Sequence, residues 1–156
     1  MALEKARDYL KKYGLADAIM EFDVSSATVE KAAAAIGCPE RAIAKTLSFL
    51  IGEKAILIVA AGDSKVDNSK YKAEFHTKAK MIPFDLVEPM IGHAVGGVCP
   101  FGVNDDVTIY LDTSLKNLET VYPACGSANS AIRLTPKQLE QITNYEKWID
   151  VCKDMA

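Results

Sequence analysis

TLSFLIGEKAILIVAA, residues 46–61, is the segment whose pattern most clearly indicates the class of fold. Two apolar and partly β-branched runs, residues 46–51 and 55–61, are separated by Gly52-Glu53-Lys54. Apolar runs of this length are typical of strands, and a short connection that contains glycine is typical of a β-hairpin. The chain is therefore predicted to contain an antiparallel pair of strands here.

Helices are predicted on both sides of this hairpin. The first has apolar residues at a three-and-four spacing and stops at Gly14. Near the other end, Thr135-Pro136-Lys137-Gln138 combines a capping threonine, a first-turn proline and a reciprocal glutamine, a pattern typical of a helix start. The predicted helices cover residues 2–13, 29–36, 40–44, 68–75 and 83–91, with a last one from residue 135. Ser25, Ser26 or Thr28 can cap the helix at residues 29–36, which Gly37 ends.

Further strands are predicted at residues 18–22, 107–111, 120–122, 130–134 and 145–151. Strands and helices mix without strict β-α-β alternation, and hairpin-like pairs outnumber candidate crossovers. The expected fold class is α/β (α+β), with a mixed, largely antiparallel sheet or partial barrel flanked by helices. No repeat, low-complexity stretch or linker divides the sequence, so residues 1–156 are expected to form a single domain.

Composition limits the classes of function. The chain has 18 basic and 21 acidic residues and a net charge of −3, so any contact with nucleic acid must be local. The N-terminus lacks the apolar core of a signal peptide, and no segment approaches the roughly 20 apolar residues that cross a bilayer. A cytoplasmic protein with no membrane contact is expected.

The four cysteines argue against a metal site. Cys38, Cys99, Cys125 and Cys152 form no CxxC pair, and only two histidines are present to join them as ligands. Mostly buried, reduced thiols are expected in an unexported chain of this size. No metal and no cofactor are therefore expected.

Lys45 is the first candidate for chemistry. It stands between the predicted short helix and the first hairpin strand, with apolar residues on both sides. Such a lysine can be a fixed cation that holds a phosphate or polarises a carbonyl group. The alternative is a lysine at the start of a strand whose ammonium extends to water.

A glycine-rich loop is the second candidate. Residues 92–102, GHAVGGVCPFG, contain four glycines, which let the backbone approach a ligand and turn its N–H groups inward. Such donors suit an oxyanion or a carbonyl group, although the loop could also be only a tight turn. The small-residue turn at residues 125–130 could form an opposite wall of a cleft, or simply join two strands.

Lysines gather between residues 65 and 80. Lys65, Lys70, Lys72, Lys78 and Lys80 alternate with aromatic residues and are offset by only two acidic ones. The segment suits phosphates and a stacked base, although a solvated helix face has the same appearance. No conventional motif of a nucleophile with its base is present, neither GxSxG nor HExxH.

Taken in order, these features resemble the YbaK family from about residue 28 to residue 151. The resemblance is carried by Lys45-Thr46-Leu47, by residues 67–72, by the loop from Gly96 to Gly102, and by Gly126 with Ile132-Arg133-Leu134-Thr135-Pro136. The family includes free-standing proteins and the editing insertion of bacterial prolyl-tRNA synthetases. Its members remove wrongly attached small amino acids from tRNA.

The resemblance implies that Lys45 is the functional lysine and that the loop from Gly96 to Pro100 borders the aminoacyl pocket. The expected catalytic residues are Lys45, Gly96, Gly97 and Pro100. The expected substrate-binding residues are Ile43, Thr46, Phe49, Val98, Cys99, Phe101, Gly102, Gly126 and Ser127. The expected tRNA-binding residues are Lys65, Lys70, Lys72 and Lys80.

The implied function is a trans-acting aminoacyl-tRNA deacylase that clears Cys, Ala, Ser or Thr from tRNA for proline or a related tRNA. Its implied partners are the acceptor end of aminoacyl-tRNA and a synthetase such as prolyl-tRNA synthetase. The family branch that clears alanine has a histidine before the last helix, where this chain has Cys125, Gly126 and Ser127. Alanine is therefore not supported by that position, and the amino acid stays open.

The mechanism expected from these residues needs no triad, because an aminoacyl ester is already activated. A positioned water and stabilisation of the oxyanion suffice. Two other classes remain open at this point. One is a non-catalytic tRNA- or synthetase-binding module of the same fold, and the other is a thiol-reactive protein that uses Cys99 or Cys125.

Overall fold

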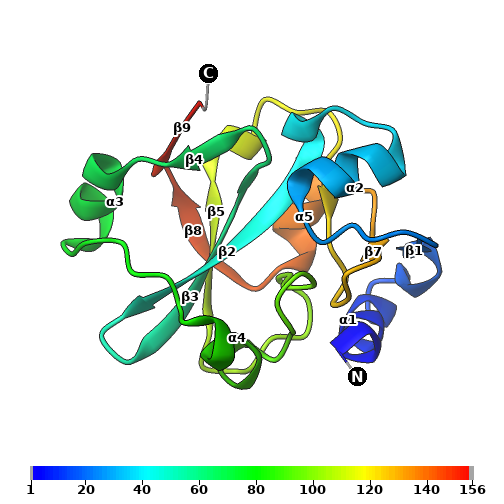
Figure 1. Ribbon diagram of the computed structural model, residues 1–156, viewed down its shortest axis with the longest axis horizontal. Helices are drawn as coiled ribbons and strands as arrows, with labels where there is room; N and C mark the ends of the chain where they lie inside the picture. Colours follow the sequence, from blue (N-terminus) through cyan, green and yellow to red (C-terminus); the bar gives the residue numbers. More distant parts are fainter. Residues whose placement is uncertain (1, 155–156) are drawn as a thin grey trace.

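A five-stranded sheet forms the centre of the molecule (Figure 1). The computed structural model describes residues 2–154. The strands follow the order β6-β2-β3-β5-β8 and comprise β2 (Ile43–Ile51), β3 (Lys54–Ala61), β5 (Thr108–Asp112), β6 (Tyr122–Pro123) and β8 (Tyr145–Ile149). The predicted hairpin is confirmed, since Ile51 pairs with Lys54 and Gly52 takes a φ of 62° in the two-residue turn.

The sheet is mixed, as predicted, but its central part is less antiparallel than expected. β2 and β3 are antiparallel, whereas β2–β6, β3–β5 and β5–β8 are parallel. The physical reason is the long crossover from β3 to β5, which carries other elements and brings β5 back in the same direction as β3. Sequence patterns reveal hairpins more readily than such crossovers.

Two small antiparallel sheets complete the strands. One pairs β1 (Met20–Glu21) with β7 (Ser130–Ala131), and the other pairs β4 (Ser64–Val66) with β9 (Cys152–Asp154). Neither β4 nor β9 was predicted, because each is only three residues long and lacks a long apolar run. The predicted helix at residues 40–44 is only a 3-10 turn, Glu40–Ala42, and β2 begins directly after it, where Ile43 pairs with Tyr122.

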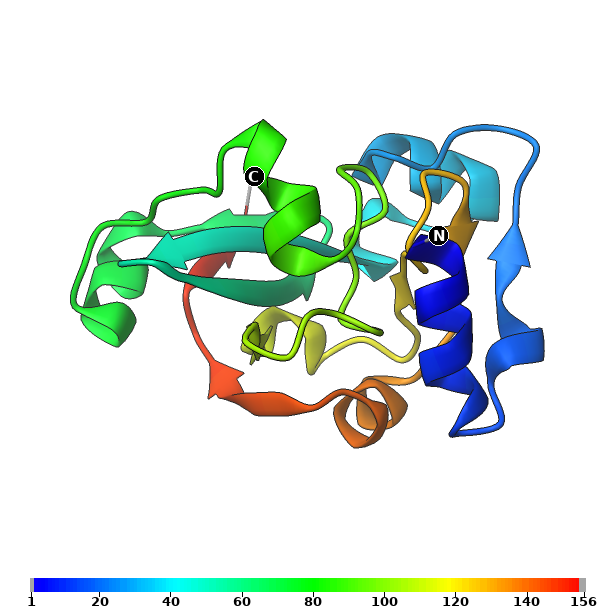
Figure 2. The same ribbon diagram turned by 90° about the horizontal axis from the view of Figure 1, so that it is seen from below.

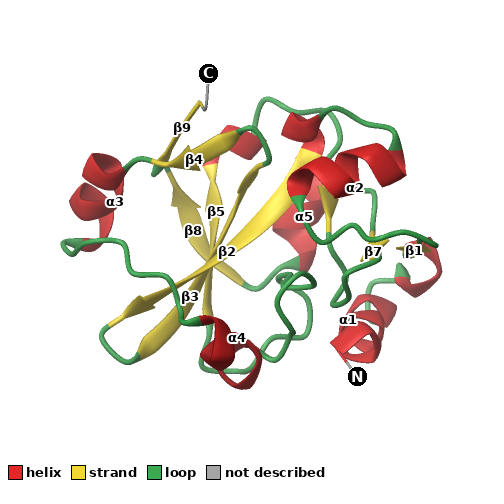
Figure 3. Ribbon diagram, in the orientation of Figure 1, coloured by secondary structure: helices red, strands yellow, loops and turns green. Residues whose placement is uncertain are grey.

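Within residues 2–154, five α-helices flank the sheet (Figure 3). They are α1 (Ala2–Lys11), α2 (Val29–Ile36), α3 (Asn68–Phe75), α4 (Phe84–Ile91) and α5 (Pro136–Ile142), with further 3-10 turns at Ala16–Ala18 and Thr113–Leu115. Two predicted caps are confirmed. Thr28 accepts a hydrogen bond from the backbone of Lys31 and starts α2, while Thr135 and Gln138 form a capping box at α5.

β3 is buried on both faces, which explains its uninterrupted apolar sequence. Ala55, Leu57 and Val59 belong to the larger core, to which α1, α4 and α5 contribute Leu10, Ile91 and Leu139. The alternate side chains Ile56, Ile58 and Ala60 belong to a second core that includes Tyr71 of α3. Figure 2 shows the sheet curling between these layers, in agreement with the expected partial barrel flanked by helices.

Within residues 2–154, no helix has both the length and the apolar character needed to cross a membrane.

Candidate functional site

A cavity of about 390 Å³ lies along one edge of β2. Its walls come from the start of α2, from β2, from the start of α4 and the loop after α4, and from the strands β6 and β7. Figure 2 shows α4 and α2 on the same side of β2, with the first part of the loop after α4 between them. The lining residues are Ser26, Ala27, Thr28, Val29, Ala32, Ile43, Ala44, Lys45, Thr46, Leu47, Ser48, Met81, Ile82, Phe84, Val87, Val95, Gly96, Val98, Tyr122, Ala124, Ser130 and Ala131.

The cavity lies where the outer edge of β2 has no neighbouring strand. β6 pairs with β2 only at Ile43 and Ala44, and the chain at residues 80–82 joins the same edge from Ser48 onward, where Ile82 donates to the Ser48 carbonyl at 3.2 Å. Within residues 2–154, no strand covers the position between them. Peptide groups alternate in direction along an antiparallel pair, so the register directs the N–H and C=O of Thr46 toward the cavity.

The Thr46 side chain adds a second polar group at this place. Its hydroxyl oxygen is buried and has no hydrogen-bond partner among the described residues. A buried hydroxyl without a partner is costly, and such groups often mark a place where a ligand or water binds. Thr46 therefore offers a backbone donor, a backbone acceptor and a hydroxyl at the cavity wall.

Lys45 lies half-buried on β2 among the lining residues. Its ammonium donates to the carbonyl of Ser64 and, at 3.4 Å, to the carbonyl of Gly62. Burial lowers the pKa of Lys45, while the neighbouring Cys152 and Asp63 act in the opposite direction. An ammonium group has three hydrogens. Two carbonyl contacts hold this one in position and leave a hydrogen for an anion or a polarised carbonyl.

The first half of the glycine-rich loop reaches the cavity. Gly96, with a φ of 93°, and Val98 are lining residues. A Cβ atom on Gly97 would lie 2.5 Å from the backbone nitrogen of Ser127, so the loop packs directly on the turn at residues 126–127. Gly97, Gly126 and Ser127 thus form a support behind the wall, and the Ser127 hydroxyl lies 2.6 Å from that of the lining residue Ser130.

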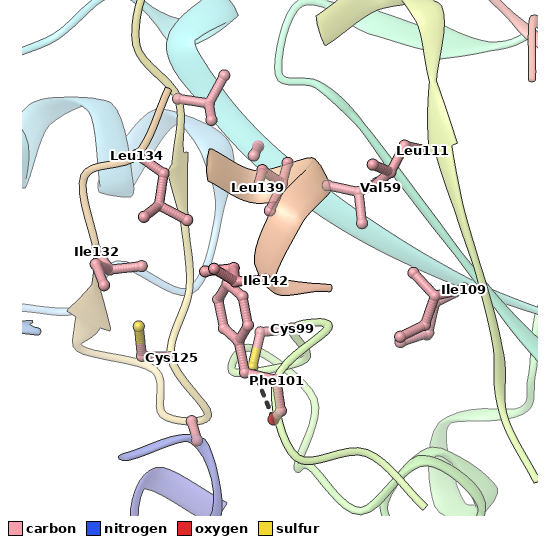
Figure 4. Close-up of a cluster of buried hydrophobic side chains, with 14 of the residues drawn as sticks. Val59, Cys99, Phe101, Ile109, Leu111, Cys125, Ile132, Leu134, Leu139 and Ile142 are labelled. Atoms are coloured by element: carbon pink, nitrogen blue, oxygen red, sulfur yellow. Dashed lines mark hydrogen bonds between the residues drawn. The ribbon is translucent and has the colours of Figure 1, made fainter. Parts of the chain in front are cut away.

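The second half of the loop leaves the cavity. Cys99 and Phe101 are fully buried and point into the larger core, as Figure 4 shows. Pro100 and Gly102 line a different hollow of the surface, against α1. Pro100, Cys99, Phe101 and Gly102 therefore do not line this cavity, because the chain turns inward after Val98, and their expected roles at the substrate pocket stay predictions.

Phe49 is also away from the cavity. Side chains alternate along β2, and the Phe49 ring packs at 5.3 Å from the ring of Tyr71 in the second core. Phe49 is therefore not a lining residue of this cavity, and its expected role in substrate binding stays a prediction. Ile43, Thr46 and Val98 do line the cavity, as expected.

The thiols near the loop are not in a reactive environment. Burial raises the pKa of Cys99 to about 12, and burial also raises the pKa of Cys125. A thiol that stays protonated at neutral pH and is closed off from solvent is a poor nucleophile. These observations argue against the thiol-reactive alternative.

The lysines expected to bind tRNA do not line the cavity, and they differ in how free they are. Lys70 donates to Asp150 at 3.1 Å and to the carbonyl of Cys152 at 3.0 Å. Lys65, Lys72 and Lys80 are exposed, and Lys80 directly precedes the lining residue Met81. Their contact with tRNA remains a prediction.

Several lining residues were not predicted as site residues. Ser26, Thr28, Tyr122 and Ser130 add hydroxyl groups, and Met81, Phe84 and Val95 add apolar surface. Sequence patterns identify Thr28 only as a possible helix cap, and nothing local links it to Lys45. The two come together because α2 packs beside β2, which depends on the tertiary fold.

The chemical inventory of the cavity is simple. Among the described residues, its lining contains one cation, several hydroxyl groups and apolar walls, but no Asp, Glu, His or Cys. No cluster of three such side chains that could hold a metal was found within residues 2–154. The cavity is therefore suited to bind and polarise a ligand with a carbonyl or phosphate group, rather than to supply a nucleophile or a base.

Comparisons with known proteins agree with this geometry. Residues 23–142 match the model of the family described as the aminoacyl-tRNA editing domain. The uncharacterized protein YwhH of Bacillus subtilis is 50% identical over 155 residues, which cover 99% of each chain. EbsC of Enterococcus faecalis, named as a candidate Cys-tRNA(Pro)/Cys-tRNA(Cys) deacylase, is 26% identical over 120 residues, 75% of this chain and 73% of that protein.

The fold has a close counterpart among solved structures. A structure described as a candidate trans-editing enzyme for prolyl tRNA synthetase superposes with a TM-score of 0.86, at 27% identity and 97% coverage of both chains. The family match extends over most of the chain and includes the elements that line the cavity from α2 to β7. The chain belongs to the aminoacyl-tRNA editing domain family, the YbaK/EbsC family.

Proposed function

We propose that this chain is a trans-acting deacylase that hydrolyses the ester between a small amino acid and the terminal ribose of a mischarged tRNA. The observation that carries the proposal is the half-buried Lys45 ammonium beside the unpaired edge of β2 at Thr46. The similarity to EbsC, named as a candidate Cys-tRNA(Pro)/Cys-tRNA(Cys) deacylase, supports it, as does the similarity to the structure described as a candidate trans-editing enzyme for prolyl tRNA synthetase.

The reaction proceeds by attack of a positioned water on the ester carbonyl carbon. The bond between that carbon and the ribose oxygen breaks, the amino acid leaves as a carboxylic acid, and the ribose oxygen takes a proton that came from the water. The negative charge on the carbonyl oxygen in the tetrahedral state is the main barrier, and preorganised donors lower it. Lys45 and the peptide N–H of Thr46 supply a fixed cation and a fixed dipole for this purpose.

The walls of the cavity act as a second sieve. A synthetase pocket distinguishes one methylene by only about 1–3 kcal/mol, so small amino acids leak through. Ile43 and Val98 give this cavity apolar walls, and Thr46 and Ser130 give it hydroxyl groups near them. The cavity thus accepts a small side chain and excludes a larger one by contact.

Exposed lysines are proposed to hold the tRNA. Lys65, Lys72 and Lys80 are available for backbone phosphates, whereas Lys70 is engaged with Asp150. Each lysine that neutralises a phosphate makes binding weaker at higher salt.

The test is a deacylation assay with tRNA for proline charged with Ala, Cys, Ser, Thr or Pro, in which loss of the ester is measured over time. Replacing Lys45 with Ala is expected to reduce kcat/KM by about 100-fold or more, as removal of one oxyanion donor does. Lys54→Ala, at an exposed position of β3, is the matched control and should retain full activity.

The outcomes separate the candidate functions. Selective release that depends on Lys45 supports the proposal and identifies the amino acid. Full activity of Lys45→Ala would contradict the role of this lysine. Binding of tRNA without release from any pair would instead favour the non-catalytic binding module.

A further inference from the structure

An exposed apolar rim surrounds the mouth of the cavity. Phe84 is 78% exposed, Met81 61% and Val95 47%, yet all three are lining residues of the cavity. Large apolar side chains scattered singly on a surface need no explanation, but three at the mouth of one cavity mark a binding surface. None of them has a role in the chemistry described above.

Phe84 is held in this position by α4. It is the first residue of the helix, directly after Pro83, and it shares a face with Val87 and Ile91 at spacings of three and seven residues. Val87 and Ile91 are buried in the larger core, which fixes the helix. The apolar face of α4 therefore continues beyond the core to Phe84, which lies at the mouth of the cavity.

We propose that Phe84, flanked by Met81 and Val95, is a stacking platform for the terminal adenine base of the aminoacyl-tRNA. The inference rests on the proposed function. The aminoacyl group and the adenine are attached to the same ribose, so an aminoacyl group inside the cavity places the base at its mouth. An aromatic face stacks on a base favourably and without need of hydrogen bonds.

The charges around the rim indicate the direction of the RNA backbone. Lys80 is exposed beside Met81, whereas Asp85 and Glu88 are exposed on α4. Phosphates are attracted to the first and repelled by the other two. The chain that precedes the terminal nucleotide therefore leaves the cavity on the side of Lys80.

A protein partner fits this surface less well. A stable protein interface buries about 800 Å² on each side and takes some 20–30 residues. Three side chains around one cavity mouth match a single base better.

The test measures binding without turnover. The probes are two RNA hairpins that mimic an acceptor stem and carry, through a stable amide at the 3′ end, the amino acid that the deacylation assay identifies, or serine where it identifies none; one hairpin has a terminal adenine and the other an abasic terminal ribose. Phe84→Ala should weaken binding of the adenine hairpin roughly 10- to 100-fold, the range of one stacked base, and should leave the abasic hairpin unaffected. Phe84→Trp should restore affinity for the adenine hairpin.

Leu86→Ala is the matched control, because Leu86 is 42% exposed on the same helix but is not a lining residue. It should bind both hairpins like the parent protein. Equal affinity of the parent and Phe84→Ala for the adenine hairpin, or an equal loss for both hairpins, would overturn the inference. So would no binding of the adenine hairpin by the parent protein.

The same proteins in the deacylation assay keep the two proposals apart. Deacylation by a parent protein that does not distinguish the hairpins would leave the proposed function standing and remove the platform. Binding of the adenine through Phe84 without any deacylation would support the stacking platform and contradict the proposed function.

Discussion

The two halves of the loop between α4 and β5 have opposite surroundings. Gly96 and Val98 face the cavity, whereas Cys99 and Phe101 are fully buried in the larger core. The direction changes within one peptide unit, between Val98 and Cys99. One half is therefore placed to meet a ligand, while the other half fixes the loop to the core.

The buried half explains how a glycine-rich wall can be rigid. Glycine allows the backbone many conformations, so a glycine-rich segment is normally flexible. Here the Phe101 ring packs among core side chains, and the Phe101 carbonyl lies 2.6 Å from Nε2 of the buried His93 at the start of the same loop. Phe101 therefore anchors the second half of the loop in the core, and its contact with His93 joins the two ends of the loop.

The largest effect is expected from removing the anchor. Phe101→Ala deletes a fully buried aromatic side chain and should lower the free energy of unfolding by about 3–5 kcal/mol. Urea denaturation followed by circular dichroism measures this loss. A loss below about 1 kcal/mol would show that the second half of the loop is not an anchor, and the comparison of the two halves would fail.

A smaller effect, of a different kind, is expected from the cavity half. Val98→Ala enlarges the cavity, and since Val98 is only partly buried the fold should lose less stability than with Phe101→Ala. The change should appear as relaxed selectivity, with larger aminoacyl groups gaining up to about 1–3 kcal/mol of transition-state binding. Deacylation rates for a series from alanine to valine measure it, and an unchanged series would place Val98 outside the substrate pocket.

The base of the loop is expected to respond to pH. Burial lowers the pKa of His93, an effect opposed by the Phe101 carbonyl and increased by the charge of Lys5. The unfolded chain then binds a proton that the folded chain does not, so stability should fall as pH decreases below about 6.5. The slope is at most about 1.4 kcal/mol per pH unit, the value for one proton.

Two variants test this assignment by urea denaturation between pH 5 and 8. His93→Asn should remove the slope that this histidine causes. His76→Asn is the control, since His76 is exposed and its left-handed conformation, with a φ of 60°, suits asparagine. A slope that disappears with His76→Asn and persists with His93→Asn would assign the effect to the wrong histidine.

How far the sequence could predict this loop follows from the range of the interactions. Local sequence patterns predicted the ends of elements correctly. Thr28 starts α2 and Gly37 ends it, Thr135 starts α5, and Gly52 forms the turn of the hairpin. The resemblance to the YbaK family also led to Lys45, Gly96 and Val98, which the cavity brings together.

What the sequence could not predict is the direction in which a side chain points, as distinct from its position along the chain. A loop has no fixed periodicity, so nothing in residues 96–102 reveals that the side chains reverse after Val98. The direction of Phe49 could not be predicted for a related reason, because sequence alone does not decide which face of a strand meets the cavity when both faces are buried. Met81 and Phe84 were not predicted as site residues, because only the tertiary fold shows that these exposed apolar side chains lie beside the cavity.

The smallest effect on activity, namely none, is expected from alkylation, and it bears on the same two halves. Iodoacetamide at pH 8 should modify the native protein only at Cys38, the one free thiol among the described residues that is not buried. Cys99 should stay unmodified because burial raises its pKa to about 12 and excludes the reagent. Intact mass should therefore show one adduct in the native protein, none in Cys38→Ser, and four in urea for the parent chain, whose four cysteines are then accessible.

Deacylation should be unchanged after native labelling, because Cys38 does not line the cavity. Rapid labelling of Cys99 with loss of activity would mean that the second half of the loop opens to solvent, and the thiol-reactive alternative would then gain the support that the closed core denies it.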